Sequence, residues 1–180
     1  MGYLLGSIPV AYLVARSRGI GILEVGTQNP GAANVFRTVS RPLGVFVLVA
    51  DVLKGFAAVA VADVLGVPAP IAAVAGAACL VGHWYPLFLK FRGGTGMASA
   101  GGVVIGLSPV AGTVAAAVTL VALVLMRNTG RAGGAGYLGF LIVSLLTTAW
   151  ATIAGATLMA SMVVSRAAYL RMLDRRRDAR

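Results

Sequence analysis

The longest uncharged segment of the chain, Met97–Met126, constrains most strongly what the chain can fold into. It holds 30 residues without a single Asp, Glu, Lys or Arg. At about 1.5 Å per residue one helix of that length would measure about 45 Å, more than the ~30 Å hydrocarbon core of a bilayer. Ser108-Pro109 lies near its middle, where proline disfavours continued helix. We therefore predict two membrane-embedded helices that separate at Ser108.

Three other segments have the length and apolarity that a membrane span requires. Leu43–Ala62 and Pro70–Phe91 are each long enough for one span of about 20 residues. Tyr137–Val164 is a second long uncharged run, and we expect it to break near Trp150 or Gly155. The composition agrees with this reading, because 59% of the 180 residues are hydrophobic and 11% are charged, whereas a soluble domain has about 25% charged residues.

The composition also excludes several classes of protein. Cys79 is the only cysteine, which excludes a disulfide-stabilised secreted scaffold. The hydrophobicity excludes intrinsic disorder, and an interior of this size could not bury so much apolar surface in water. The sequence therefore predicts an all-α polytopic membrane protein with a single integral membrane domain, residues 1–165, and a basic cytoplasmic tail, residues 166–180.

The formal net charge of +10 comes mainly from short connections between the apolar runs. Fourteen of the fifteen Lys and Arg residues lie within residues 16–42, 90–96, 127–136 and 166–180. With both long runs divided, about seven transmembrane or half-length helices place all four connections on the cytoplasmic side, with the N-terminus outside and the C-terminus inside. We expect no nucleic-acid partner, because no basic run is interleaved with aromatic residues.

The first fifteen residues are apolar but short for a span. They lack a basic region at the start, and Arg16 stands where a signal peptide would have small residues for cleavage. We expect a first span that lacks its first residues rather than a signal peptide. The segment Arg131–Gly136, with glycine at three of its positions, is expected to form a flexible loop.

Two polar segments carry the residues that could bind a phosphate. In the first, Gly26–Arg37, glycines allow close approach of the backbone, amides and a hydroxyl offer hydrogen bonds, and Arg37 offers a planar fork that suits phosphate. A helix that starts after Pro30-Gly31 would add free N–H groups, although an ordinary polar turn would show the same pattern. In the second, Gly93, Gly94 and Gly96 follow Lys90 and Arg92, which is typical of an anion-binding nest or of a helix-ending turn.

Two further features could serve the same site. His83 is the only histidine, and with few acids and one cysteine we expect neither a metal site nor a cofactor. Asp51 and Lys54 lie three residues apart on one helix face within an apolar span, where ionisable groups are either functional or a neutralising pair.

The four motifs together resemble the bacterial acyl-phosphate-dependent glycerol-3-phosphate acyltransferase family, whose pattern reads roughly GSIPxxYLxxR, GSGNPGATNVxR, DxxKG and GHxxPxFxxFKGGKGVAT. This chain has GSIPVAYLVAR at 6–16, GTQNPGAANVFR at 26–37, DVLKG at 51–55 and GHWYPLFLKFRGGTGMAS at 82–99. Order and spacing agree over residues 1–107. The resemblance implies seven spans in a bacterial inner membrane, with the active face cytoplasmic.

The resemblance also implies a reaction and a set of site residues. Members of the family move a fatty acyl group from acyl phosphate to glycerol 3-phosphate and form lysophosphatidic acid for phospholipid synthesis. Acyl phosphate is already activated, so positioning and charge stabilisation can supply most of the catalysis. The residues expected to act in catalysis are His83, Arg37 and Asn34. Those expected to bind substrate or phosphate are Thr27, Asn29, Gly31, Lys54, Arg92, Gly93, Gly94, Thr95 and Gly96.

The chain departs from the family pattern at several positions. Thr95 stands where the family has lysine, Gln28 stands where it has glycine, and the C-terminal HxxNIxRLxxGxE pattern is absent around Arg166. Two other functions therefore remain open. One is a catalytically weakened relative that binds lipid phosphates or regulates a partner. The other is a small phosphate transporter, which the charged pair Asp51 and Lys54 within a span suggests. The expected partners are acyl phosphate, glycerol 3-phosphate and membrane lipids, and the sequence does not fix the oligomeric state.

Overall fold

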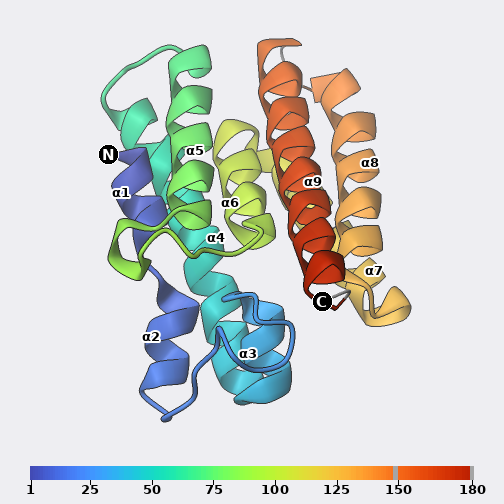
Figure 1. Cartoon of the computed structure of the whole chain (residues 1–180). Helices are drawn as coiled ribbons and strands as arrows, with labels where there is room; N and C mark the ends of the chain where they lie inside the picture. The colour runs from blue at the N-terminus through green and yellow to red at the C-terminus, as the bar shows by residue number, and fades with distance from the viewer. Residues whose placement is uncertain (148–149, 179–180) are drawn as a thin grey trace.

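The computed structural model of the chain describes residues 1–147 and 150–178, and all regular secondary structure within them is helical (Figure 1). In chain order the elements are α1 (Gly2–Ser7), α2 (Val10–Arg16), α3 (Ala32–Thr38), α4 (Arg41–Val64), α5 (Ala69–Trp84), the 3-10 turn η1 (Leu87–Leu89), α6 (Met97–Leu107), α7 (Pro109–Met126), α8 (Thr129–Thr147) and α9 (Trp150–Asp178). The predicted all-α class is confirmed for the described residues.

Four stretches of the described chain are long and apolar enough to cross a membrane, namely Arg41–Val64, Ala69–Leu89, Pro109–Met126 and Trp150–Leu170. The α6 helix is apolar but shorter. These stretches confirm that the predicted apolar runs form membrane-type helices. The number of about seven spans and the orientation of the termini stay predictions. The predicted boundary between membrane domain and tail, at 165/166, falls within α9.

Both long uncharged runs are divided, as predicted. Ser108 has an extended backbone (φ −149°, ψ 90°) and ends α6, while Pro109 occupies the first turn of α7, where its missing N–H costs nothing. The second run divides near Trp150, where α9 begins after α8 has ended at Thr147. Gly155 lies inside α9, so the alternative break there is wrong.

The structure refines the end of one predicted span and contradicts one predicted loop. The span predicted over Pro70–Phe91 stops being α-helical at Trp84, because Pro86 forces Tyr85 out of the helical region (φ −125°, ψ 63°). The loop predicted over Arg131–Gly136 is the first half of α8.

Close helix packing explains why the glycine-rich part of α8 is helical. A Cβ atom on Gly136 would overlap the hydroxyl of Thr119 on α7, so glycine there lets the two helices touch. The spacings Gly2/Gly6 and Gly102/Gly106 act in the same way. A Cβ at either of the first pair would meet backbone carbonyls of α5, and a Cβ at either of the second pair would meet α4.

The distribution of side chains is that of a protein surrounded by lipid. Many large apolar residues point outward, with Val64 86% and Leu146 85% exposed. Several polar side chains are instead buried inside the helix bundle, namely Ser7, Asn34, Asp51, Lys54, His83, Ser99, Ser108, Ser144, Thr152 and Arg166. Polar groups that face the bundle interior and apolar groups that face outward are what a bilayer requires.

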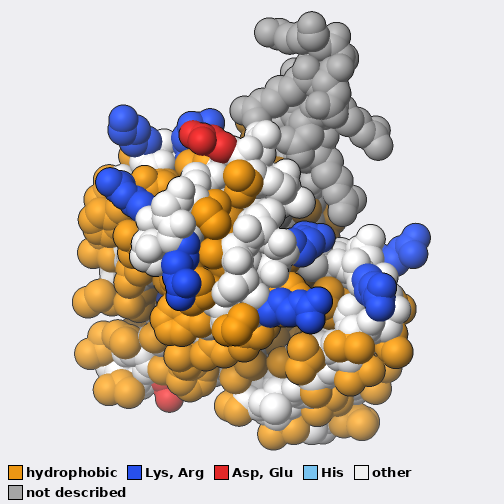
Figure 2. Space-filling model, turned by 90° about the horizontal axis from the view of Figure 1, so that it is seen from below, with side chains coloured by type: hydrophobic (Ala, Val, Ile, Leu, Met, Phe, Trp, Pro, Cys, Tyr) orange, Lys and Arg blue, Asp and Glu red, His pale blue; other side chains and the backbone are white. Residues whose placement is uncertain are grey.

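The connections between the helices fall at two opposite ends. In Figure 1 the α2–α3 and α7–α8 connections lie at the lower end with the C-terminus, whereas the α4–α5 connection lies at the upper end. Figure 2 views the lower end and shows Lys and Arg side chains spread across it. The structure therefore gathers these cationic connections at one end of the molecule, as the distribution of charge along the chain predicts.

Candidate functional site

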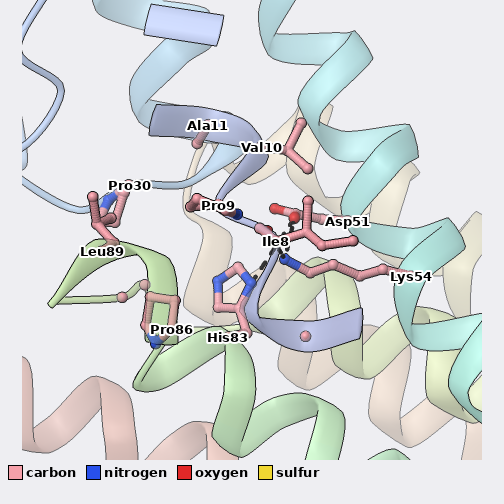
Figure 3. Close-up of a pocket in the computed structure, with 13 residues that line it drawn as sticks. Ile8, Pro9, Val10, Ala11, Pro30, Asp51, Lys54, His83, Pro86 and Leu89 are labelled. Carbon is pink, nitrogen blue, oxygen red and sulfur yellow. Dashed lines mark hydrogen bonds and ion pairs between the residues drawn. The ribbon is translucent and has the colours of Figure 1, made fainter. Parts of the chain in front are cut away.

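A buried polar cluster joins α4, α5 and α6 to the joint between α1 and α2. Lys54 Nζ lies 2.7 Å from Asp51 Oδ1 and donates a hydrogen bond of 3.2 Å to the carbonyl of Ile8. Ser99 Oγ lies 3.4 Å from His83 Nδ1, and Asp51 Oδ1 lies 3.9 Å from the same nitrogen. Three helices thus place a carboxylate, an ammonium, a hydroxyl and an imidazole side by side. Figure 3 shows Asp51, Lys54 and His83 of this cluster.

The other ring nitrogen of His83 faces the second glycine-rich turn. A Cβ atom on Gly94 would lie 2.8 Å from His83 Nε2, 3.2 Å from Asn29 Oδ1 and 3.2 Å from the carbonyl of Pro30. The two glycine-rich segments therefore meet at the imidazole, although Asn29 and Gly94 are 65 residues apart in sequence. Asn29 Oδ1 is buried and has no hydrogen-bond partner in the described part of the chain.

Hydrogen bonds from Trp84 fix the turn that contains Gly94. The N–H of Gly93 donates to the carbonyl of Trp84 (3.0 Å), and Trp84 Nε1 donates to the carbonyl of Thr95 (2.8 Å). Gly96 then starts α6 with a left-handed backbone (φ +80°), which glycine adopts readily. The turn is therefore held from both sides before any ligand arrives.

Asn34 holds the first polar segment in shape. Its Nδ2 donates to the carbonyls of Ile22 (3.2 Å) and Val25 (3.0 Å), and its Oδ1 accepts from the N–H of Thr27 (3.1 Å). The side chain is 1% exposed. These three contacts hold the segment in shape, and the expected catalytic role of Asn34 stays a prediction.

The predicted helix after Pro30-Gly31 is present as α3. Gly31 is its N-terminal boundary residue, with an extended backbone. The guanidinium of Arg37 on the last turn of α3 is exposed, and its Nε donates to the carbonyl of Ala33 (3.1 Å). Arg92, next to the glycine turn, is exposed as well.

The cavity enclosed by the cluster is small. It measures about 10 Å³, roughly the space of one water molecule. Its lining combines the α1–α2 joint with both glycine-rich segments, namely Gly6, Ile8, Pro9, Val10, Ala11, Pro30, Asp51, Lys54, His83, Pro86, Leu89, Gly93 and Gly94 (Figure 3). A substrate phosphate therefore does not fit inside this cluster, and a ligand would bind at its outer edge.

The structure brings some of the predicted residues together and leaves others apart. Asn29, His83, Gly93 and Gly94 meet around one point, and Lys54 lies behind them. The ammonium of Lys54 is bound by Asp51 and a backbone carbonyl, which favours the neutralising-pair alternative over direct phosphate binding. Arg37, Arg92, Thr27, Thr95 and Gly96 do not line the cavity.

The structure connects three polar residues to this region through contacts that the sequence does not predict. Asp51 was recognised as the partner of Lys54 but not as a neighbour of His83. Ser99 gives no signal in sequence, because its contact with His83 depends on how α5 and α6 pack. Arg166 was assigned to a basic tail, but it donates to the carbonyl of Trp84 (3.3 Å) and is 8% exposed.

Comparisons with known proteins agree on one family. The profile of the family described as glycerol-3-phosphate acyltransferase matches residues 1–174. The glycerol-3-phosphate acyltransferase of Geotalea daltonii is 39% identical over 164 residues, which are 90% of this chain and 84% of that protein.

Two solved structures share the fold. The crystal structure of PlsY (YgiH), an integral membrane glycerol 3-phosphate acyltransferase, in its glycerol 3-phosphate form superposes with a TM-score of 0.83 at 30% identity, covering 97% of this chain and 90% of that one. Its lysophosphatidic acid form superposes with a TM-score of 0.81 at the same identity, covering 97% and 89%. This chain is therefore similar to an integral membrane protein along nearly its whole length.

Proposed function

Since the chain belongs to the glycerol-3-phosphate acyltransferase family, we propose that it transfers a fatty acyl group from acyl phosphate to glycerol 3-phosphate. The product is lysophosphatidic acid, a precursor of phospholipids. The proposed setting is the bacterial inner membrane, which the chain crosses several times, with the reaction at its cytoplasmic face. The gathering of Lys and Arg at one end of the molecule supports this orientation (Figure 2).

The observation that carries the proposal is the meeting of Asn29, His83 and Gly94. An imidazole nitrogen and the buried amide oxygen of Asn29, which has no hydrogen-bond partner among the described residues, both face the same glycine. An amide can offer either its oxygen or its nitrogen, and a neutral imidazole nitrogen can donate or accept. A substrate hydroxyl at this edge would satisfy both groups.

In the proposed reaction, the hydroxyl oxygen of glycerol 3-phosphate attacks the carbonyl carbon of acyl phosphate. A new ester bond forms, the bond between that carbon and the phosphate oxygen breaks, and inorganic phosphate leaves. The hydroxyl proton passes to the leaving phosphate, either directly or through His83 Nε2. Ser99, and more distantly Asp51, hold the opposite nitrogen, so the ring is oriented before the substrate binds.

The proposed phosphate contacts come from the backbone of the second glycine-rich segment and from two exposed arginines, one in or beside each segment. The backbone around Gly93 and Gly94 is already fixed by Trp84, which suits a preorganised anion site. Arg37 and Arg92 are exposed and carry the planar forks that pair with phosphate oxygens. Asn34 acts in this scheme as a positioning residue for the segment that carries Asn29.

A second function is favoured by one observation. Thr95 places a neutral hydroxyl in the turn where the family pattern has lysine, which weakens the attraction for two phosphates. A relative that binds lipid phosphates with little or no turnover would fit this change. Phosphate transport was suggested by the charged pair within α4, and this pair is explained by mutual neutralisation of Asp51 and Lys54.

The proposal is tested with purified protein in detergent, supplied with acyl phosphate and radiolabelled glycerol 3-phosphate. We expect lysophosphatidic acid and inorganic phosphate in equal amounts. His83→Gln should lower the rate about 100-fold or more, since positioned acid–base groups contribute on that scale. Arg127→Gln changes an exposed cation at the end of α7 and serves as the matched control.

Two outcomes decide between enzyme and binding protein. Product no greater than that of a mock preparation, together with retained binding of acyl phosphate, contradicts the enzyme and supports the second function. Thr95→Lys restores the cation of the family pattern, so a gain in rate with this variant indicates a weakened enzyme.

A further inference from the structure

A buried arginine on α9 has no acidic partner among the described residues. The side chain of Arg166 is 8% exposed. One terminal nitrogen donates to the hydroxyl of Tyr85 (3.2 Å) and the other donates to the carbonyl of Trp84 (3.3 Å). Its Nε is buried and has no acceptor within the described chain. The ion pairs of the described residues do not involve this guanidinium.

Aromatic rings surround the guanidinium but cannot neutralise it. Its central carbon lies 4.8 Å from the ring centre of Tyr85, 5.6 Å from that of Tyr169 and 6.0 Å from that of Trp84. Such contacts stabilise a cation by about 0.5–2 kcal/mol, which is less than the several kcal/mol that burial of a charge costs. The site therefore keeps a net positive charge in a poorly solvated place, where an anion would be bound favourably.

The guanidinium lies in an open groove between the end of α5 and the middle of α9. The groove encloses about 410 Å³ and is lined by Val81, Trp84, Tyr85, Ser161, Met162, Ser165, Arg166 and Tyr169. One wall is apolar or aromatic, and the remaining groups are hydroxyls and the cation. Tryptophan and tyrosine near the end of a spanning helix are typical of the level at which lipid headgroups lie.

We propose that this groove binds the phosphate of an acidic phospholipid of the surrounding bilayer, with Arg166 as the counter-charge and the apolar wall against the acyl chains. The phosphate of such a lipid would pair with the guanidinium, and its acyl chains would pack against the apolar residues of the groove. A free phosphate would use only the cation and leave the apolar wall uncovered. The groove shares no lining residue with the cavity at His83, so a lipid can occupy it without filling that cavity.

The groove is joined to the glycine turn by Trp84. The carbonyl of Trp84 accepts hydrogen bonds from both Gly93 and Arg166, and its indole holds the carbonyl of Thr95. A lipid phosphate bound to Arg166 would therefore contact a side chain that is hydrogen-bonded to Trp84, the residue that fixes the glycine turn. The binding itself is independent of the proposed function, since it needs no turnover.

Fluorescence quenching in bilayers of defined composition tests the proposal. The chain has two tryptophans, so Trp150→Phe leaves Trp84, which lines the groove, as the only one. This full-length variant is placed in phosphatidylcholine bilayers that contain increasing amounts of phosphatidylglycerol brominated on its acyl chains, or of equally brominated phosphatidylcholine. We expect brominated phosphatidylglycerol to quench half-maximally at a mole fraction about five-fold lower or less, the factor that one interfacial cation provides.

Two variants link the preference to the cation. In Arg166→Gln the preference should fall to less than about two-fold, the effect left to nonspecific surface charge. Ser165→Glu keeps Arg166 but adds a carboxylate to the groove, so it should also abolish the preference, even if Arg166→Gln fails to fold. Arg127→Gln, an exposed cation outside the groove, should keep the preference.

Several outcomes would overturn the proposal. Equal quenching by the two lipids contradicts it, as does a full preference in both groove variants. Displacement of brominated phosphatidylglycerol by millimolar inorganic phosphate or glycerol 3-phosphate would assign the groove to a soluble anion. Displacement by acyl phosphate at a much lower mole fraction would assign it to the reaction substrate.

Discussion

At the scale of single residues, Asp51 and Lys54 are two ionisable groups whose burial inside the bundle is costly. They lie one turn apart on α4, almost fully buried, with 2.7 Å between Lys54 Nζ and Asp51 Oδ1. Burial of two charges is offset only while they remain paired. The pair therefore stabilises the fold through its partner contacts, and the loss of either member alone leaves the other uncompensated.

Lys54→Met is expected to lower the free energy of unfolding by about 3–5 kcal/mol, since it leaves a buried carboxylate without its cation. The double variant Asp51→Leu with Lys54→Met removes both charges and should cost less than Lys54→Met alone. Chemical unfolding in detergent micelles measures both. Asp51→Leu alone completes the comparison: if its loss and that of Lys54→Met simply add up in the double variant, the two charges are not coupled in the way described.

Gln28 occupies a backbone conformation that glycine adopts more easily. Its φ is +53°, and the family pattern has glycine at this position. The variants Gln28→Gly and Gln28→Ala both remove the side-chain amide, so they differ mainly in the cost of the left-handed backbone. We expect the glycine variant to be more stable by about 1 kcal/mol. Thermal unfolding of the two variants side by side checks this, and equal stabilities would contradict it.

The residue-level features that could be predicted are those within a single helix or motif. The Asp51–Lys54 pair follows from a spacing of three, and the start of α3 follows from Pro30-Gly31. The contact between His83 and Ser99 could not be predicted, because it depends on the packing of α5 against α6. The hydrogen bonds of Asn34 could not be predicted for a similar reason, since they need the folded path of the whole segment.

At the scale of helices, glycine sets how closely the elements approach. Gly101 and Gly102 are neighbours on α6, but a Cβ at Gly102 would overlap the carbonyl of Val52 on α4, whereas nothing lies within 4 Å of a Cβ at Gly101. The two positions thus have nearly the same helix propensity and opposite packing environments.

Gly102→Ala is expected to destabilise the protein by about 1–3 kcal/mol, because α6 must move away from α4. Gly101→Ala is the matched control and should be neutral or stabilising by up to about 1 kcal/mol, because alanine favours the helix. Unfolding in detergent measures both changes. Similar losses at the two positions would mean that helix propensity, and not contact with α4, governs this helix.

The ends of helices were predictable where proline determines them. Pro109 places the break between α6 and α7, and this break was predicted from the length of the uncharged run. The first half of α8 was wrongly predicted as a loop, because a run of glycines is ambiguous between flexibility and close packing. Within a membrane, unpaired backbone groups are costly, and close packing on α7 favours the helix.

At the scale of the whole molecule, the placement of charge predicts how the protein sits in the membrane. The α4–α5 connection and the α7–α8 connection lie at opposite ends (Figure 1). The first carries no Lys or Arg between Leu65 and Pro68, whereas Arg127 lies in the second. The sequence predicted this separation, because short connections with positive charge stay in the cytoplasm.

Thiol labelling of intact cells tests that orientation. Cys79 is buried, so single cysteines introduced at the exposed positions Leu65 and Asn128 report with little background. We expect a membrane-impermeant maleimide to label Leu65→Cys in intact cells, and to label Asn128→Cys only after the membrane is opened. The reverse pattern would place the proposed site on the outer face of the membrane.

The small size of the cavity at His83 has a consequence for how substrates would arrive. The described residues around His83 leave only about 10 Å³, which is too small for a fatty chain. An acyl donor that reacts at the edge of the cluster can keep its hydrocarbon tail among neighbouring lipids throughout. Its supply then depends on lateral diffusion and on its density in one leaflet, and not on its concentration in the aqueous phase.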